Sequence, residues 1–290
     1  MGIPLLLAVV SLGAQEPASA PSTPPRAEPV ADDLPLPIPQ SAETQPLPAV
    51  NPEAGRDGQP TDPSRPIEVR ILSPRSREII PTSTVDVFLQ VDNYLLAEEG
   101  NRLHVLVDNQ PPQPWHDVAR PFPLKNLNQG GHTVRVLAVR PDGTSLRQPG
   151  AFAMVHFFVK KKDFQNYTDP TLPFLTVNLP AGGPASLDAN ERLCFDYWVH
   201  NVDFSGEHAV RLRYKLDVYE GTLTEPGPVL WANLQPGRHR LLVELFDAAG
   251  QPIFGPFNRV EREFEIRQIL RAVPLPPETH LPQVPGAPLP

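Results

Sequence analysis

The sequence predicts an all-β chain of two tandem antiparallel sandwiches flanked by disordered proline-rich arms. Three observations lead to this prediction. A block of sequence occurs twice at an offset of 107 residues, apolar and polar residues alternate along several short segments, and 14 of the 40 prolines lie within residues 15–66. Repetition at this period indicates two copies of one module, and alternation with period two indicates strands with one face on a core.

The repeat is clearest between residues 124 and 159, where eight residues recur 107 positions later. Residues 126–132 read NLNQGGH, and residues 233–239 read NLQPGRH. We therefore expect one sandwich over 67–162 and a second over 163–271, each of a usual domain size.

Each expected sandwich has the same succession of short strands and turns. Alternating residues predict strands at 85–91, 103–107, 134–136 and 151–159, and again at 193–199, 210–214, 241–243 and 260–266. Gly143 and Gly250 precede the last strand of each module, and a hairpin turn at these places needs the positive φ that glycine tolerates.

The segments outside the sandwiches predict export and disorder. Residues 15–66 and 272–290 have no apolar period, so they cannot bury enough surface to offset chain ordering. Residues 1–14 resemble a secretory signal peptide, with an apolar run and small residues but no preceding Lys or Arg. We expect an exported protein of the periplasm or cell surface. No later apolar stretch reaches the ~18 residues of a transmembrane helix.

Charge and cysteine content limit the partners and the disulfides that we expect. The formal net charge is −8 and no segment is strongly basic, so we expect no nucleic-acid partner. The single cysteine, Cys194, allows no intrachain disulfide.

The residues around the repeated block carry a family resemblance. The succession Leu127, Gly130, His132 and Val136, followed by a turn and a last strand, resembles the end of immunoglobulin-like and fibronectin type III-like modules. The segment 149–155, PGAFAMV, resembles uncharacterised exported bacterial proteins of tandem immunoglobulin-like build. The resemblance covers 67–267; it implies tandem immunoglobulin-like sandwiches and says almost nothing about activity.

The repeated histidines are candidates for a structural role. In the folds that the chain resembles, an aromatic residue at the start of the penultimate strand hydrogen-bonds to backbone and holds the preceding corner. His132 and His239 occupy this place. A ligand role is the alternative, but neither has a second His, Cys or carboxylate at ligand spacing on its strand face.

A loop of the first module is a candidate binding site. Trp115, His116 and Asp117 lie in a proline-rich connection, and the matching stretch of the second module has no such residues. Function is often added to a repeat in a loop that its twin lacks. The alternative is that Trp115 covers the sandwich edge while His116 and Asp117 are solvated.

The face of the strand 193–199 that points away from its core is the third candidate. It would hold Cys194, Asp196, Trp198 and His200. A metal site and a Cys/His nucleophile pair are two interpretations, but side chains two residues apart on a strand are separated by about 6.5–7 Å. We therefore favour packing on the other module or on a partner, with Trp198 and His200 as binding residues.

These observations predict a non-enzymatic binding or scaffold protein of the bacterial cell envelope. It would engage an envelope protein through sandwich loops or sheet edges. No phosphate loop, Gly-x-Ser-x-Gly or His-Glu-x-x-His motif occurs, so we expect no catalytic residue, metal or cofactor. One alternative is a carbohydrate-binding accessory protein that stacks sugars on Trp115, Trp198 or Trp231. The other is an enzyme built on the 193–200 face.

Overall fold

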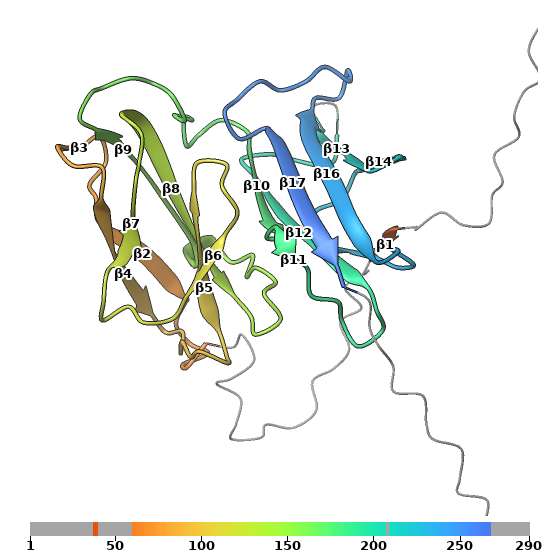
Figure 1. Cartoon of the computed structure of the whole chain (residues 1–290), viewed down its shortest axis with the longest axis horizontal. Helices are drawn as coiled ribbons and strands as arrows, with labels where there is room; N and C mark the ends of the chain where they lie inside the picture. The colour runs from red at the N-terminus through yellow and green to blue at the C-terminus, as the bar shows by residue number, and fades with distance from the viewer. Residues whose placement is uncertain (1–36, 40–59, 207–208, 268–290) are drawn as a thin grey trace, which may run out of the picture. The chain divides into compact units, whose positions relative to one another are not determined.

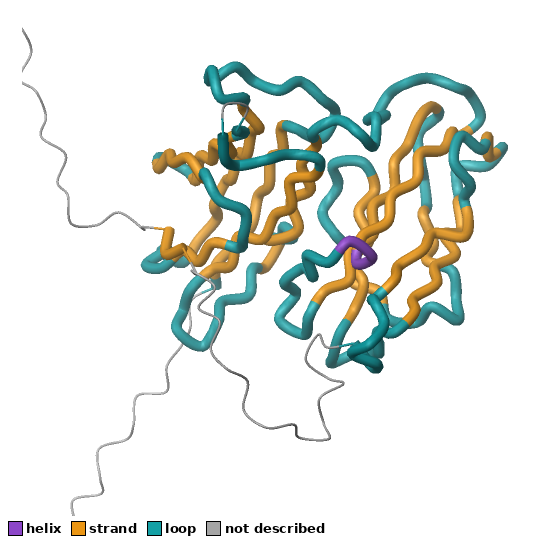
Figure 2. Tube along the Cα trace, turned by 180° about the vertical axis from the view of Figure 1, so that it is seen from behind, coloured by secondary structure: helices purple, strands orange, loops and turns teal. Residues whose placement is uncertain are grey.

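The computed structural model describes residues 37–39, 60–206 and 209–267 (Figure 1). These residues form two tandem immunoglobulin-like β-sandwiches, which confirms the predicted fold class. In the described part of the chain the helical content is one 3₁₀ turn, η1 (Pro149–Ala151), drawn purple in Figure 2.

Sandwich 1 packs a three-stranded sheet, in the order β2-β4-β7, on a five-stranded sheet, in the order β3-β9-β8-β5-β6. Its strands are β2 (Glu68–Ser73), β3 (Ile79–Ile80), β4 (Val85–Asp92), β5 (Arg102–Val107), β6 (Gln113–Trp115), β7 (Phe122–Leu124), β8 (Gly130–Val139) and β9 (Phe152–Val159).

Sandwich 2 repeats this arrangement with the sheets β1-β15-β12-β10 and β11-β17-β16-β13-β14. Its strands are β10 (Phe174–Leu179), β11 (Gly183–Pro184), β12 (Leu193–His200), β13 (Arg211–Leu216), β14 (Tyr219–Leu223), β15 (Val229–Trp231), β16 (Gly237–Phe246) and β17 (Arg259–Ile266), joined by β1 (Pro37–Pro39) from far upstream.

The expected alternation places one face of each central strand in a core. On β4, Val85, Val87 and Leu89 are buried while Asp86 and Phe88 are exposed. Each sandwich encloses a separate cluster of buried apolar side chains, so each has its own hydrophobic core.

The turns repeat as well as the strands. Gly143 and Gly250 adopt positive φ angles of 84° and 77°, as expected for their hairpins. Asn93 and Asn201, directly after β4 and β12, adopt φ angles of 59° and 56°. Asn tolerates this left-handed conformation better than most residues, which accounts for its presence at both strand ends.

The expected N-terminal arm has local structure at two places. Pro37–Pro39 forms β1, which pairs antiparallel with β15. Residues just before sandwich 1 bond to Asn93, whose Oδ1 accepts the Asp62 N–H at 2.6 Å and the Thr61 hydroxyl at 2.7 Å. Residues 60–66 of this expected arm are thus tied to sandwich 1 and are not disordered. Residues 15–36 and 40–59, the signal-like segment 1–14 and the tail 272–290 lie outside the described residues, so their assignments stay predictions.

Candidate functional site at the sandwich junction

The face of β12 that points away from its own core lies against sandwich 1. Leu193, Phe195 and Tyr197 point into the core of sandwich 2 and are at most 2% exposed. Asp196 and Trp198, on the opposite face, contact residues of sandwich 1. Among the interpretations of this face, the structure therefore favours packing on the other module.

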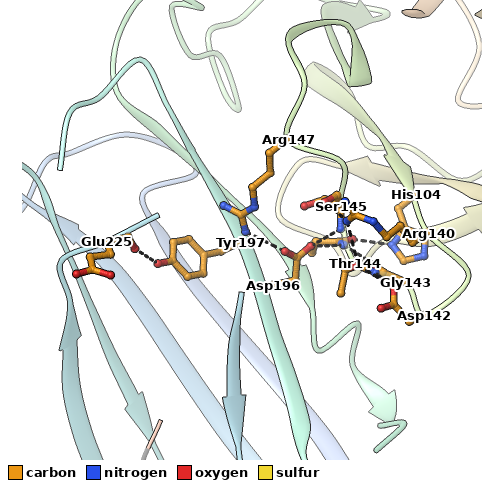
Figure 3. A network of polar contacts seen from close by, with 11 residues as sticks. His104, Arg140, Asp142, Gly143, Thr144, Ser145, Arg147, Asp196, Tyr197 and Glu225 are labelled. Atoms are coloured by element: carbon orange, nitrogen blue, oxygen red, sulfur yellow. Dashed lines mark hydrogen bonds and ion pairs between the residues drawn. The ribbon is translucent and has the colours of Figure 1, made fainter. Parts of the chain in front are cut away.

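Asp196 is the centre of a polar network across the junction (Figure 3). Its side chain is 1% exposed and accepts three hydrogen bonds. From sandwich 1, the Ser145 N–H donates at 2.9 Å and the Arg147 guanidinium at 3.0 Å; from β10, the Asn178 amide donates at 2.7 Å. A buried carboxylate is tolerated when its lone pairs are satisfied in this way.

Asn178 extends the network to two further groups of sandwich 1. Its amide N–H donates to the Gly143 carbonyl at 2.8 Å, and its Oδ1 accepts the Nδ1 proton of His104 at 2.6 Å. Burial lowers the pKa of His104, against the opposing effect of the Asn178 hydrogen bond. His104 therefore contributes a neutral imidazole to the junction.

Arg135 extends from β8 of sandwich 1 to the backbone of sandwich 2. Its guanidinium donates to the Leu175 carbonyl at 2.8 Å and to the Thr176 hydroxyl at 3.1 Å, and it also bonds the Asp108 carbonyl. The guanidinium carbon lies 4.1 Å from the centroid of the Phe257 ring. Burial lowers the pKa of Arg135 to about 9, so the side chain remains charged at neutral pH.

An aromatic cluster fills another part of the junction. The His200 ring stacks on Phe174 and on Trp198, with centroid distances of 4.2 and 4.7 Å, and Phe152 of sandwich 1 lies 4.2 Å from it. Trp198 and Phe152 also pack on the buried cluster Leu106, Leu137 and Val139 of sandwich 1. Burial, together with the charges of Arg135 and Arg147, lowers the pKa of His200 to about 3.

A second contact ties the β5–β6 turn of sandwich 1 to sandwich 2. The Arg262 guanidinium donates to the Asn109 carbonyl at 2.7 Å, and the Asn109 amide donates to the Pro256 carbonyl at 2.6 Å. The junction thus combines a satisfied buried carboxylate, two buried guanidinium groups and an aromatic cluster.

The junction lacks the properties of a nucleophilic or metal centre. Burial, followed by the charge of Asp196, raises the pKa of Cys194 to about 12, whereas a catalytic cysteine needs a lowered pKa. Residues 37–39, 60–206 and 209–267 hold no group of three or more His, Cys, Asp or Glu side chains that could bind a metal ion.

A groove of about 580 Å³ borders the junction, where Trp198 is half-buried. Charged lining residues come from both sandwiches: Arg147 from sandwich 1, and Asp203 and Glu225 from sandwich 2. An indole beside ionic hydrogen-bonding groups is a suitable surface for a polar ligand with apolar faces.

The Trp115-His116-Asp117 loop divides into covered and solvated parts. Trp115 ends β6 and packs edge-on against Phe122, with the centroids 5.3 Å apart, and its indole nitrogen is buried. His116 is exposed, and Asp117 pairs with Arg120 at 2.6 Å. The structure brings neither His116 nor Asp117 to the junction.

The repeated histidines make the same contacts in both sandwiches. His132 donates to the Asn128 carbonyl at 2.9 Å and contacts Asp108 at 2.8 Å; His239 donates to the Gln235 carbonyl at 2.8 Å and contacts Asp217 at 2.7 Å. The backbone partner is the kind expected for a corner residue. The aspartates were not expected from the sequence.

Several junction residues were missed by sequence reasoning, notably Arg135, His104 and Asn178. One signal was available. The residues of β8 that point away from the core of sandwich 1 include the apolar Leu137 and Val139, and the repeat partner of Leu137 in β16 is the charged Glu244. A strand that is apolar on both faces is usually covered on both faces.

The class of this molecule is thus a tandem pair of immunoglobulin-like sandwiches with a buried polar junction. No family model matches the chain, and no curated protein matches it. Among the described residues, no helix is long and apolar enough to span a membrane.

Solved structures that match include the fibronectin(III)-like modules of Clostridium thermocellum CbhA, at 14% identity and a TM-score of 0.26, covering 69% of this chain and 94% of that one. A glucan utilization locus protein of Bacteroides ovatus, SGBP-B, solved with a mixed-linkage heptasaccharide, matches at 12% identity and a TM-score of 0.21, over 69% and 47% of the two chains. A putative membrane anchored protein of Corynebacterium diphtheriae matches at 11% identity and a TM-score of 0.24, covering 74% of this chain and 62% of that one.

Proposed function

We propose that this chain is a non-enzymatic binding or scaffold protein that is exported to the bacterial cell envelope and binds a protein partner through a sheet edge of sandwich 2. The observation that supports this most is at β15. This strand accepts an extended segment, Pro37–Pro39, along its outer edge. Strand addition of this kind is a common way for a sandwich to bind a partner, because main-chain hydrogen bonds supply the affinity.

The junction supports the scaffold part of the proposal. Asp196, Arg135 and Arg262 each bond across it, and each is at most 5% exposed. Separating the sandwiches would leave these groups to be satisfied by water, so a fixed arrangement of the two modules is favoured. A partner bound at β15 would then be held in a defined position relative to sandwich 1.

Affinity capture from an envelope extract of the native organism tests the proposal. Full-length chain and a Leu230→Pro variant serve as baits, because proline at this position removes a main-chain donor of β15. We expect at least one envelope protein to be retained by the first bait and lost from the second. A Phe254→Ser bait is the matched control, since Phe254 is 91% exposed and lies outside β15.

The Trp198 groove gives the carbohydrate alternative a specific location. Trp231 is 1% exposed and Trp115 packs against Phe122, so neither offers an uncovered indole. Trp198 lines the groove together with Asp203 and Glu225. Affinity electrophoresis in a panel of soluble polysaccharides tests this function, with Glu225→Gln as the variant. Retardation that the variant loses would support it, and unretarded migration in every polysaccharide would exclude it.

A further inference from the structure

The two sandwiches differ at one equivalent sheet edge. β7 of sandwich 1 and β15 of sandwich 2 occupy matching places: β7 pairs with β4 in the register Val85↔Leu124, and β15 pairs with β12 in the register Leu193↔Trp231. The middle residue is Pro123 in β7 and Leu230 in β15. This single difference decides whether the outer edge can donate a hydrogen bond.

Strand geometry determines toward which edge the backbone N–H and C=O groups of these middle residues point. In an antiparallel ladder, the N–H and C=O groups of consecutive residues point to opposite edges of their strand. Pro123 has no N–H, so the two flanking residues of β7 make its hydrogen bonds to β4 and Pro123 faces outward. Because Leu230 stands at the repeat position of Pro123, its backbone groups also point to the outer edge. There Leu230 presents both an N–H donor and a C=O acceptor. Sandwich 1 therefore has a blunted edge where sandwich 2 has an open one.

The segment that occupies the open edge has a matching pattern. β1 pairs with β15 in the register Pro37↔Trp231, Ile38↔Leu230 and Pro39↔Val229. Since prolines carry no N–H, Ile38 is the one residue of β1 that can donate, and it lies opposite Leu230. The surrounding sequence, LPLPIP over 34–39, alternates proline with aliphatic residues at the period of a strand.

This alternation has a physical consequence for pairing. In an extended segment with proline at every second position, all remaining N–H groups point to one edge. Such a segment pairs with one neighbour and leaves its other edge without donors. It completes an open sheet and prevents the addition of a further strand.

We propose that the outer edge of β15 is a strand-acceptor site selective for extended segments in which proline alternates with aliphatic residues. The chain's own strand β1, Pro37–Pro39, occupies it as an internal cap. A partner segment of the same chemistry gains access by displacing this cap. The inference rests on the proposed function, because it names the chemistry of the partner segment at the proposed edge.

The internal cap makes the site competitive. Residues 40–59 tether β1 to the start of sandwich 1, so the cap is present at an effective concentration on the order of millimolar. An external segment must overcome this local concentration. Replacing the cap should therefore strengthen binding of a free peptide by at least about tenfold.

Fluorescence anisotropy with a labelled LPLPIPQ peptide tests the inference. The proteins are the full chain, a variant with 34–39 replaced by Gly and Ser at the same length, and that variant with Leu230→Pro. We expect binding to the replaced-cap variant, at least about tenfold weaker binding to the full chain, and none to the Leu230→Pro protein. Equal binding to all three proteins would overturn the inference.

A peptide control covers the case in which Leu230→Pro fails to fold. The same peptide with an N-methyl group on its isoleucine keeps every side chain but lacks the one central donor. Undiminished binding of the methylated peptide to the replaced-cap variant would contradict a strand-addition mode. A second peptide, LALAIAQ, tests selectivity, because it keeps the central donor without the prolines; binding as tight as LPLPIPQ would refute it.

The two proposals fail in different ways. If an envelope protein is captured through β15 but LPLPIPQ does not bind, the chemistry assigned to the partner segment is wrong and the proposed function stands. If LPLPIPQ binds as expected but no envelope protein depends on Leu230, the edge serves only the internal cap and the proposed function is wrong.

Discussion

At the scale of single residues, Asp196 shows how a charged side chain is accommodated between two cores. Its carboxylate accepts a backbone N–H, a guanidinium and an amide, and it is 1% exposed. Its repeat partner in sandwich 1 is Phe88, which is 47% exposed. The same register position thus meets solvent in one module and the junction in the other.

Replacing Asp196 by alanine should be strongly destabilising, because it removes the acceptor of the Ser145 N–H, of the Arg147 guanidinium and of one N–H of the Asn178 amide. We expect a loss of about 3 kcal/mol in the free energy of unfolding, as for other broken buried ion pairs. Urea denaturation measures it. Glu220→Ala is the matched control, since the Lys215–Glu220 pair is half exposed and screened by solvent, so its loss should change the free energy of unfolding far less. Equal effects of the two variants would contradict a structural role for the junction.

His200 should make stability depend on pH. Its pKa is lowered to about 3 in the folded chain, against an ordinary value of 6.5 in the unfolded chain. Between these two pH values the unfolded chain therefore binds the proton and the folded chain does not. Stability is therefore lost on acidification between about pH 6.5 and 3.

The variant His200→Phe isolates this effect, because phenylalanine keeps a ring in the aromatic stack and does not titrate. We expect the free energy of unfolding to fall less between pH 7 and 5 in the variant than in the wild type. Urea denaturation at the two pH values measures the difference. Parallel pH profiles of the two proteins would show that His200 already has access to solvent in the folded state.

At the scale of structural elements, the chain turns into β8 and into β16 at a corner that a histidine holds, His132 in sandwich 1 and His239 in sandwich 2. Each histidine contacts an acceptor at both ring nitrogens, a backbone carbonyl and an aspartate. For His132, donating to both acceptors at once requires both ring protons. Burial opposes the charged form of His132, but its hydrogen bonds and the charge of Asp108 raise its pKa overall.

His132→Gln should therefore destabilise sandwich 1 in a pH-dependent way. A raised pKa in the folded state adds stability that is fully present below pH 6.5 and is lost as the pH rises through the raised value. We expect the free-energy difference between wild type and variant to be larger at pH 6 than at pH 9. Chemical denaturation at both values gives the answer, and a pH-independent difference would count against a charged corner histidine.

The strands were predictable from sequence because their signals are local. Alternation along 85–91 and 193–199, and turns at Gly143 and Gly250, depend on neighbouring residues only. The junction was not predictable to the same degree. The Asn178 contact of His104 lies 74 positions away, and the Leu175 contact of Arg135 lies 40 positions away, so no local pattern records either. The sequence indicates that the 193–200 face packs on something, but it does not decide between the other module and a partner.

The difference between the two sheet edges was present in the sequence but needed the fold to be interpreted. Pro123 and Leu230 lie at the repeat offset of 107 residues. Their meaning depends on which edge each faces, and that follows from the register of β7 on β4 and of β15 on β12.

At the scale of the whole molecule, the account depends on the two sandwiches keeping one arrangement. A scaffold that presents a bound segment in a defined position requires it, and the bonds of Asp196, Arg135 and Arg262 favour it. Loss of Asp196 should loosen the arrangement without changing either core.

The most direct test is a distance distribution between spin labels, one on each sandwich, measured by double electron–electron resonance. Glu98→Cys and Val218→Cys are suitable positions because both side chains are exposed, with Cys194→Ser removing the native thiol. We predict a single narrow distribution that broadens when Asp196→Ala is added. A broad or multimodal distribution in the protein that retains Asp196 would contradict the account, because the two sandwiches would then move independently.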